Sequence, residues 1–188
     1  MAQFLINLPA LHSKQAQIAN SKAKVKVVCA GRQSGKTYVW RYAAVKKMLD
    51  GKKGGVLCRP KTNKELFTQF IEQDYIKPLI ESTNKTDLTV HLITGGQLTF
   101  YSSEVPDNIR GVTLDFFIVD EAAYQHGLSY SFNDCILPTM TTTEIDVMIV
   151  STPCGYDYFY SLLLKGFSNE QDFESFHFTV YDNPFCKA

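Results

Sequence analysis

The chain has 188 residues, of which 45% are hydrophobic and 20% charged, so it can bury one sizeable core, and we expect a single domain over residues 1–188. Its 19 basic and 19 acidic residues give a net charge of zero, which argues against a strong overall attraction to nucleic acid. Five scattered cysteines without a C-x-x-C pair argue against a zinc site or a disulfide framework. The chain also lacks a membrane-length apolar stretch and a signal peptide, so we expect a soluble, intracellular protein without a membrane partner.

The first predicted element is an apolar strand over residues 25–30, which runs into a phosphate-binding loop. The loop follows the pattern G-x-x-x-x-G-K-[ST], except that Ala30 stands at the first position. In this pattern the loop amides surround phosphates, the lysine reaches the outer phosphates and the hydroxyl ligates magnesium. The sequence therefore predicts a nucleoside triphosphate bound with Mg²⁺ at Thr37, through Gly31, Arg32, Gln33, Ser34, Gly35, Lys36 and Thr37.

Helical and extended patterns alternate after the loop. A predicted helix from residue 36 to about 49 ends at a glycine-rich break, and a short buried strand follows at residues 56–58, which completes a β-α-β unit. A second helix is predicted over about 63–82, where apolar residues recur at helical spacing. Alternating apolar residues then predict a hairpin over residues 88–100, placed as an edge pair of the main sheet.

Two further apolar runs, at residues 116–119 and 147–150, have the composition of central parallel strands. The C-terminal residues 179–185 are predicted to form an extended strand that leaves the domain. Strands interleaved with helices indicate an α/β fold with a mainly parallel sheet, whose ligand site lies off the carboxyl ends of the strands.

The strand at residues 116–119 leads directly into Asp120 and Glu121, the predicted second half of the nucleotide site. A carboxylate at a strand end can hold magnesium, and the next residue can polarise an attacking water. We therefore assign the metal to Asp120 and the role of general base to Glu121. A solvated acidic turn is the alternative for an isolated Asp-Glu pair.

Three further groups have two interpretations each. Ser151 and Thr152 follow the strand at 147–150 and could sense the outer phosphate, or they form a polar turn before a proline. Arg110 could neutralise charge that develops in phosphoryl transfer, or it pairs on the surface with Asp107 or Glu104. Gln15 or Gln17 could read the adenine edge, or both lie on a solvated helix face.

Taken together, these motifs resemble the ATPase domain of large terminase subunits, the DNA-packaging motors of tailed bacteriophages. The resemblance extends over about residues 11–185 and rests on four segments: residues 30–37, 108–111, 117–123 and 151–155. It implies a P-loop fold of the additional-strand (ASCE) type that hydrolyses ATP with Mg²⁺ to move double-stranded viral DNA into a procapsid. It further implies a ring homo-oligomer that works with a portal protein and a small terminase subunit in the host cytoplasm.

The resemblance also implies individual roles. Gln15 matches the adenine-contacting glutamine, with Gln17 left open, and Arg110 matches an arginine that acts on the ATP of a neighbouring subunit. Ser151 and Thr152 match a motif that couples hydrolysis to DNA movement. Residues 156–160 resemble the aromatic run after that motif, and residues 182–185 resemble the exit from the ATPase core.

This sequence departs from the family in two respects. Complete large terminase subunits continue into a metal-dependent nuclease domain whose acidic cluster is absent here, so we expect no DNA cleavage. The neutral charge leaves only local patches for DNA, at Lys22, Lys24 and Lys26 or at Lys46, Lys47, Lys52 and Lys53. Three rivals remain: a helicase-like translocase, an ATP-switched assembly module with slow turnover, and a small-molecule kinase.

Overall fold

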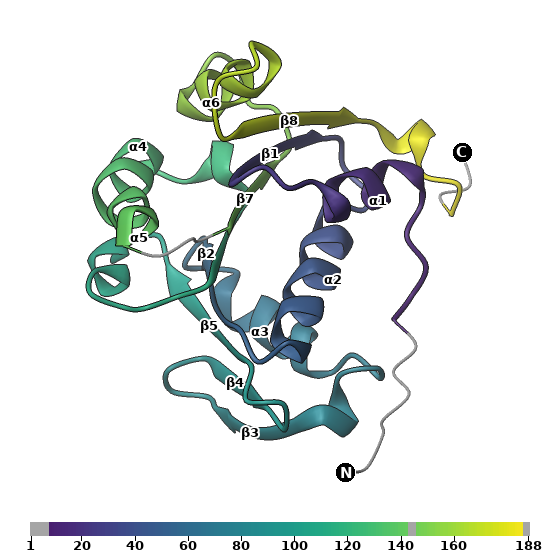
Figure 1. Ribbon diagram of the computed structural model, residues 1–188, viewed down its shortest axis with the longest axis vertical. Coiled ribbons are helices and arrows are strands. Elements are labelled where there is room, and N and C mark those ends of the chain that lie inside the picture. The colour runs from purple at the N-terminus through teal and green to yellow at the C-terminus, as the bar shows by residue number, and fades with distance from the viewer. Residues whose placement is uncertain (1–7, 143–145, 186–188) are drawn as a thin grey trace.

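The computed structural model describes residues 8–142 and 146–185 and shows an eight-stranded sheet with helices on both faces (Figure 1). The strand order is β3-β4-β5-β2-β6-β7-β1-β8; β3, β4 and β5 pair antiparallel, and all other neighbours pair parallel. The strands are β1 (Val25–Ala30), β2 (Lys53–Cys58), β3 (Ile80–Asn84), β4 (Thr89–Leu92), β5 (Gln97–Ser102), β6 (Phe116–Asp120), β7 (Asp146–Ser151) and β8 (Phe173–Phe178). This confirms the mainly parallel α/β fold, and β7 between β1 and β6 is the strand that defines the additional-strand type.

The helices divide the core into two layers. On one face lie α1 (Ser13–Asn20), α2 (Lys36–Leu49) and α3 (Asn63–Ile71), and on the other α4 (Leu128–Tyr130), α5 (Leu137–Thr142) and α6 (Tyr158–Phe167) (Figure 1). Alternate strand residues point to opposite layers, so Val28 packs in the first and Val27 in the second. Because central strands are buried on both faces, they are apolar throughout, as predicted. None of the described helices is both long and apolar enough to cross a membrane.

The centre of the sheet requires two glycines in β2. A Cβ atom built on Gly54 would lie 2.1 Å from the ring of Phe116, and one on Gly55 would lie 2.5 Å from the ring of Phe117. Both distances are far below a van der Waals contact, so the two aromatic rings of β6 pack where β2 has no side chains. This packing sets β6, whose end carries the predicted acidic pair, directly beside β2.

Two predictions for the middle of the chain are wrong: the length of the helix over 63–82 and the edge position of the hairpin over 88–100. The helix predicted over 63–82 ends at Ile71, and the chain continues through a short 3₁₀ helix, Lys77–Leu79, into β3. Pro78 interrupts the helical pattern, and β3 is a mostly exposed edge strand without an apolar signal. The hairpin of β4 and β5 is confirmed, but β3 lies outside it and β5 pairs with β2, so the hairpin is not the edge.

At the C-terminus, the extended strand predicted over 179–185 is also wrong. The strand is β8, which ends before these residues, and Val180–Asp182 form a 3₁₀ helix. β8 is an edge strand in which the polar residues Glu174, Ser175 and His177 break both a continuous apolar run and a regular alternation, so neither signal revealed it. The thiols of Cys29 and Cys58 are free and buried in the core, as expected.

Candidate nucleotide-binding and hydrolysis site

The predicted phosphate loop connects β1 with α2. Gly35 is the N-cap of α2 with a φ of 92°, a left-handed conformation that glycine adopts without strain. The Ser34 hydroxyl donates to the carbonyl of Gly31 over 2.6 Å, and the Gly31 amide donates to the carbonyl of Phe178 in β8. These bonds hold the loop around the N-terminus of α2, where free amides and the helix dipole favour an anion.

Three segments that the sequence singled out meet at Glu121. Lys36 Nζ lies 3.0 Å from Glu121 Oε1 in an ion pair. The other oxygen, Oε2, accepts from the Thr152 amide at 3.4 Å and from the Thr152 hydroxyl at 3.3 Å. Glu121 itself has φ 49° and ψ 48°, a left-handed conformation uncommon for a non-glycine residue and frequent at functional sites. The phosphate loop, the acidic strand end and the predicted coupling motif therefore form one cluster.

Asp120 lies behind this cluster and is buried. Its Oδ1 atom accepts a hydrogen bond of 3.1 Å from the indole Nε1 of Trp40 in α2. Burial raises the pKa of the Asp120 carboxyl to about 6; the neighbouring charge of Glu121 acts in the same direction, and the Lys36 charge opposes it. Sequence reasoning missed Trp40, because an indole in an apolar helix position is indistinguishable from core.

The groups available to Mg²⁺ are oxygen donors. Thr37 precedes Trp40 by one turn of α2, so its hydroxyl lies on the helix side that faces the end of β6. Magnesium prefers carboxylate and other oxygen ligands together with the oxygens of bound phosphates. Among the described residues, no hydrogen bond or ion pair reaches Asp120 Oδ2. Thr37 and Asp120 thus fit the predicted metal.

Ser151 joins the ends of the two strands that carry the cluster. Its fully buried hydroxyl accepts from the amide of Ala123 at 3.0 Å and donates to the carbonyl of Thr152 at 2.9 Å. A simple solvated turn would leave this hydroxyl in water. The hydroxyl instead joins the segment after β6 to the segment after β7.

Gln15 lies against the phosphate loop. Its side chain is 3% exposed; Nε2 donates to the carbonyl of Gly35 at 3.1 Å, and Oε1 accepts from the amide of His12. The alternative of a solvated helix face is wrong for Gln15 and correct for Gln17, which is exposed. A hollow of about 420 Å³, of the size that small molecules occupy, opens beside Gln15, lined by Ala10, Gln15, Gly35, Tyr38, Asn183 and Phe185.

Two loop residues show their side chains to solvent. Arg32 and Gln33 are exposed, and Gln33 has a φ of 58°. The Gln33 carbonyl accepts a hydrogen bond of 3.1 Å from Asn183 Nδ2, which attaches the C-terminal segment to the phosphate loop. No sequence signal marked Asn183 as a neighbour of the loop, since 150 residues separate the two positions.

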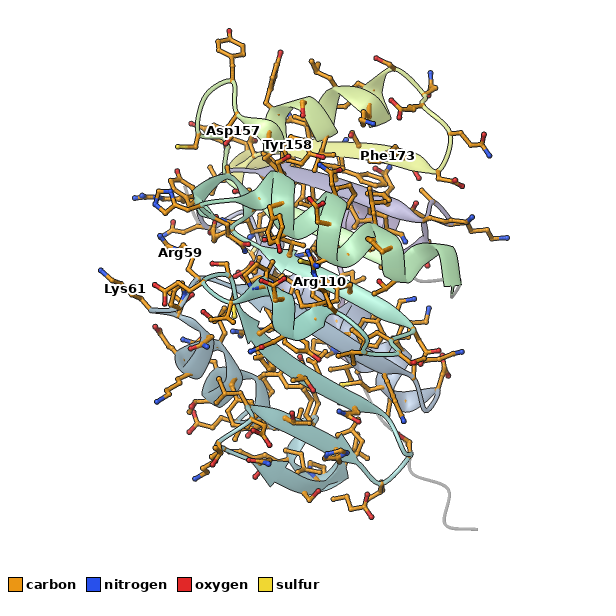
Figure 2. The ribbon with its side chains drawn as sticks, turned by 90° about the vertical axis from the view of Figure 1, so that its left-hand side faces the viewer. Arg59, Lys61, Arg110, Asp157, Tyr158 and Phe173 are labelled. Atoms are coloured by element: carbon orange, nitrogen blue, oxygen red, sulfur yellow. The ribbon has the colours of Figure 1, made fainter. Side chains whose placement is uncertain are left out.

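Arg110 lies close to α4 and contacts residues outside the phosphate loop (Figure 2). Its Nε atom is 2.9 Å from Asp107 Oδ1 in an ion pair, and its NH2 group donates to the Tyr130 hydroxyl at 2.7 Å. The surface pairing with Asp107 is therefore present, and in the described part of the chain no hydrogen bond or ion pair joins Arg110 to residues 31–37.

Four of the seven lysines in the two basic patches predicted for DNA form ion pairs. Lys24 pairs with Asp172, Lys52 with Asp115, and Lys26 and Lys47 both pair with Asp146. Lys26 is buried, and burial lowers its pKa despite the Asp146 charge. The four paired lysines offer little free charge to a polyanion, whereas Lys22, Lys46 and Lys53 are exposed and form no ion pair with any described residue.

A different basic surface follows the carboxyl end of β2. Arg59, Lys61 and Lys64 are exposed, and within residues 8–142 and 146–185 none of them has an ion pair. Arg59 and Lys61 project from the same edge of the molecule (Figure 2). The Arg59 guanidinium lies 5.9 Å from the ring centre of Tyr124, and a hollow of about 480 Å³ lies between this surface and His126. We call Arg59, Lys61 and Lys64 the basic edge.

Known proteins with this architecture include phage terminases. The chain is 30% identical over 210 residues to the terminase large subunit of Thermus virus P23-45. This match covers 91% of the present chain but only 42% of the length of that relative. It matches the large terminase ATPase domain of Thermus phage P74-26 with a TM-score of 0.75 and 28% identity, covering 89% of this chain and 80% of that one. The fold also matches a large terminase from a thermophilic bacteriophage, solved in complex with ADP, at TM-score 0.72 and 18% identity, with 95% and 48% covered.

The family comparison extends over most of the site. The family described as "Terminase large subunit, T4likevirus-type, N-terminal" matches residues 27–186, which include the phosphate loop, the acidic strand end and the segment after β7. Gln15 lies before the matched region. The residues that converge on Glu121 are therefore those of a terminase N-terminal region, and the chain belongs to the family of terminase large subunits of the T4-like type.

Proposed function

We propose that this domain hydrolyses ATP with Mg²⁺ and that hydrolysis drives double-stranded viral DNA into a procapsid. One observation carries the proposal: Lys36, Glu121 and Thr152, from three separate segments, meet within hydrogen-bonding distance. Solved structures of a relative support it, because the large terminase of the thermophilic bacteriophage is described in complex with ADP and with ATP-γ-S.

We assign each group of the site a task. Lys36 and the amides of the phosphate loop hold the outer phosphates. Thr37 and Asp120 hold Mg²⁺, which neutralises charge on the phosphate oxygens when bound. Glu121 accepts the proton of the attacking water, a role that suits a carboxylate 29% exposed at the edge of the cleft.

Bound phosphates would compete with Glu121 for the Lys36 ammonium, which forms an ion pair with that carboxylate. A bound triphosphate carries more negative charge than one carboxylate, so it draws the Lys36 ammonium away from Glu121. Glu121 then keeps its hydrogen bonds with Thr152, and we expect these bonds to change when ATP is hydrolysed. We propose that Thr152 and Ser151 pass this change to the ends of β6 and β7, the coupling role.

Steady-state hydrolysis tests the proposal. We expect turnover of ATP that depends on Mg²⁺ and rises with double-stranded DNA once the domain is assembled with its portal, small subunit and neighbouring copies in the host cytoplasm. A helicase-like translocase would respond to single strands instead, and an assembly module would bind ATP with slow turnover whether or not DNA is present. We expect no cleavage of the DNA by these residues.

We expect Gln15→Ala to weaken ATP binding about tenfold and to reduce the preference for ATP over GTP. A glutamine amide donates and accepts at once, which suits the adenine edge, and Gln15 lines the hollow beside the loop. Competition binding of both nucleotides measures the effect. Gln17→Ala is the control, because Gln17 is on the same helix and exposed; an equal loss in both variants would contradict the assignment to Gln15.

The basic edge is the surface we propose for the DNA backbone. We expect Arg59→Ala with Lys61→Ala to remove most of the DNA stimulation, to lower the salt dependence of DNA binding, and to leave hydrolysis without DNA unchanged. The matched control is Lys24→Ala with Lys52→Ala, which removes two charges already paired with Asp172 and Asp115. Equal stimulation in the two double variants would show that DNA binds elsewhere.

A further inference from the structure

Trp40 is the one tryptophan in the chain, and it is fully buried. We propose that Trp40 is a positioning residue for the metal site: its indole N–H fixes the Asp120 carboxylate so that the second oxygen of that carboxylate is presented to Mg²⁺. The inference rests on the proposed function, since it concerns the same nucleotide site, and it adds a residue that the motifs do not contain.

The indole is held in one orientation. Its ring stacks on Phe70 with an interplanar angle of 5° and a centroid distance of 6.5 Å, and the Arg41 guanidinium lies 5.5 Å from its centre. With the ring fixed between α2 and α3, the N–H direction is fixed as well. The bond of 3.1 Å to Asp120 Oδ1 therefore sets the rotation of the carboxylate.

The acceptor of this hydrogen bond distinguishes a positioning role for Trp40 from a role in core packing alone. A buried indole N–H needs an acceptor, and a backbone carbonyl would satisfy it. Here the acceptor is the carboxylate at the end of β6, two strands away from the phosphate loop in the order β6-β7-β1. An indole N–H donates only, so it stabilises the ionised carboxylate that a metal requires.

The position of Trp40 in α2 completes the geometry. Trp40 follows Thr37 by three residues, so the helix turn that carries the metal-binding hydroxyl also carries the group that orients the metal-binding carboxylate. One turn of α2 therefore places both magnesium ligands: it carries Thr37 directly, and it holds Asp120 through Trp40. Loss of the N–H would leave Asp120 Oδ1 buried without its donor and free the carboxylate to rotate.

The test is ADP binding by isothermal titration calorimetry, with saturating Mg²⁺ and with EDTA. We expect Trp40→Phe to reduce the gain in affinity that Mg²⁺ provides by about tenfold or more, as for other groups that orient metal ligands, and to leave the affinity in EDTA unchanged. Phe67→Leu is the control, because it trims another buried aromatic side chain of α3 in the same core layer, one that packs against Phe100, and leaves the stack on Trp40 and its N–H in place. We expect that variant to keep the full gain.

Each failure has its own meaning. If the unchanged protein shows no gain with Mg²⁺, the proposed metal role itself fails. If it shows the gain and Trp40→Phe retains it, or if Phe67→Leu loses as much, Trp40 is a packing residue and the inference is overturned. Should Trp40→Phe not fold, the emission of Trp40 in the unchanged protein decides: we expect it to change when Mg²⁺ joins bound ADP, and an unchanged spectrum overturns the inference.

Discussion

Glu121→Gln is expected to lower the rate of ATP hydrolysis by at least about 100-fold, since a positioned general base contributes roughly 10²–10⁴ to a rate. The amide keeps the size of the side chain and its contacts with Thr152 but cannot accept the proton of water. ATP binding should be equal or tighter, because Lys36 no longer has a carboxylate 3.0 Å away that competes with the phosphates. Turnover and a nucleotide-binding titration on the same preparation give both quantities.

The control for this variant is Glu104→Gln. Glu104 is exposed and lines the hollow beside Arg59, so the same chemical change is made near the site but outside it. We expect its turnover to equal that of the unchanged protein. Normal turnover of Glu121→Gln would remove Glu121 from the role of base, and loss of ATP binding in that variant would show that the ion pair organises the loop.

Arg110→Ala is expected to lower hydrolysis in the assembled ring by about 1000-fold, the lower end of the effect of an arginine supplied to a phosphoryl transfer. Nucleotide binding by the isolated domain should not change, because Arg110 contacts Asp107 and Tyr130 and not its own phosphate loop. The contrast between the isolated and the assembled protein is the measurement. An equal loss in both would indicate a structural role for the cluster around Asp107.

Mixed rings sharpen this prediction. A subunit with Arg110→Ala keeps its base, and a subunit with Glu121→Gln keeps its arginine, so a ring with both contains some sites that have one intact group from each neighbour. We expect partial recovery of hydrolysis in the mixture. A subunit that carries both Arg110→Ala and Glu121→Gln is the control partner: it has no arginine to offer a neighbour, so it should restore nothing to Arg110→Ala rings. No recovery in the mixture would place Arg110 outside the neighbouring site.

Local sequence patterns predicted the central part of the fold well. The strands that end at Asp120 and Ser151 are apolar and buried on both faces, so composition reveals them. The helix after the phosphate loop has apolar residues at helical spacing on one side, so periodicity reveals it. The two edge strands were missed for the opposite reason. β3 and β8 have one edge without a partner and exposed, polar residues, and nothing in their own sequence requires a strand.

The contacts within the site show the same division. The motifs marked Lys36 and Glu121 because their residue types follow the chemistry of phosphate and water. The residues that support them, Trp40 and Asn183, were not predicted, since each depends on a partner far away in the chain. Arg59 and Lys61 were missed as well, because free surface charge can be recognised only when the pairing of all other charges is known.

The attachment of the C-terminal segment to the phosphate loop limits how short this domain can be made. The Gly31 amide of the loop donates a hydrogen bond to the Phe178 carbonyl, and the Gln33 carbonyl accepts one from Asn183 Nδ2. A version that stops after α6 would keep every catalytic motif but lose β8, the neighbour of β1, and both of these bonds. We therefore expect the smallest fragment that binds a nucleotide to extend to Asn183, well past the last sequence motif of the site.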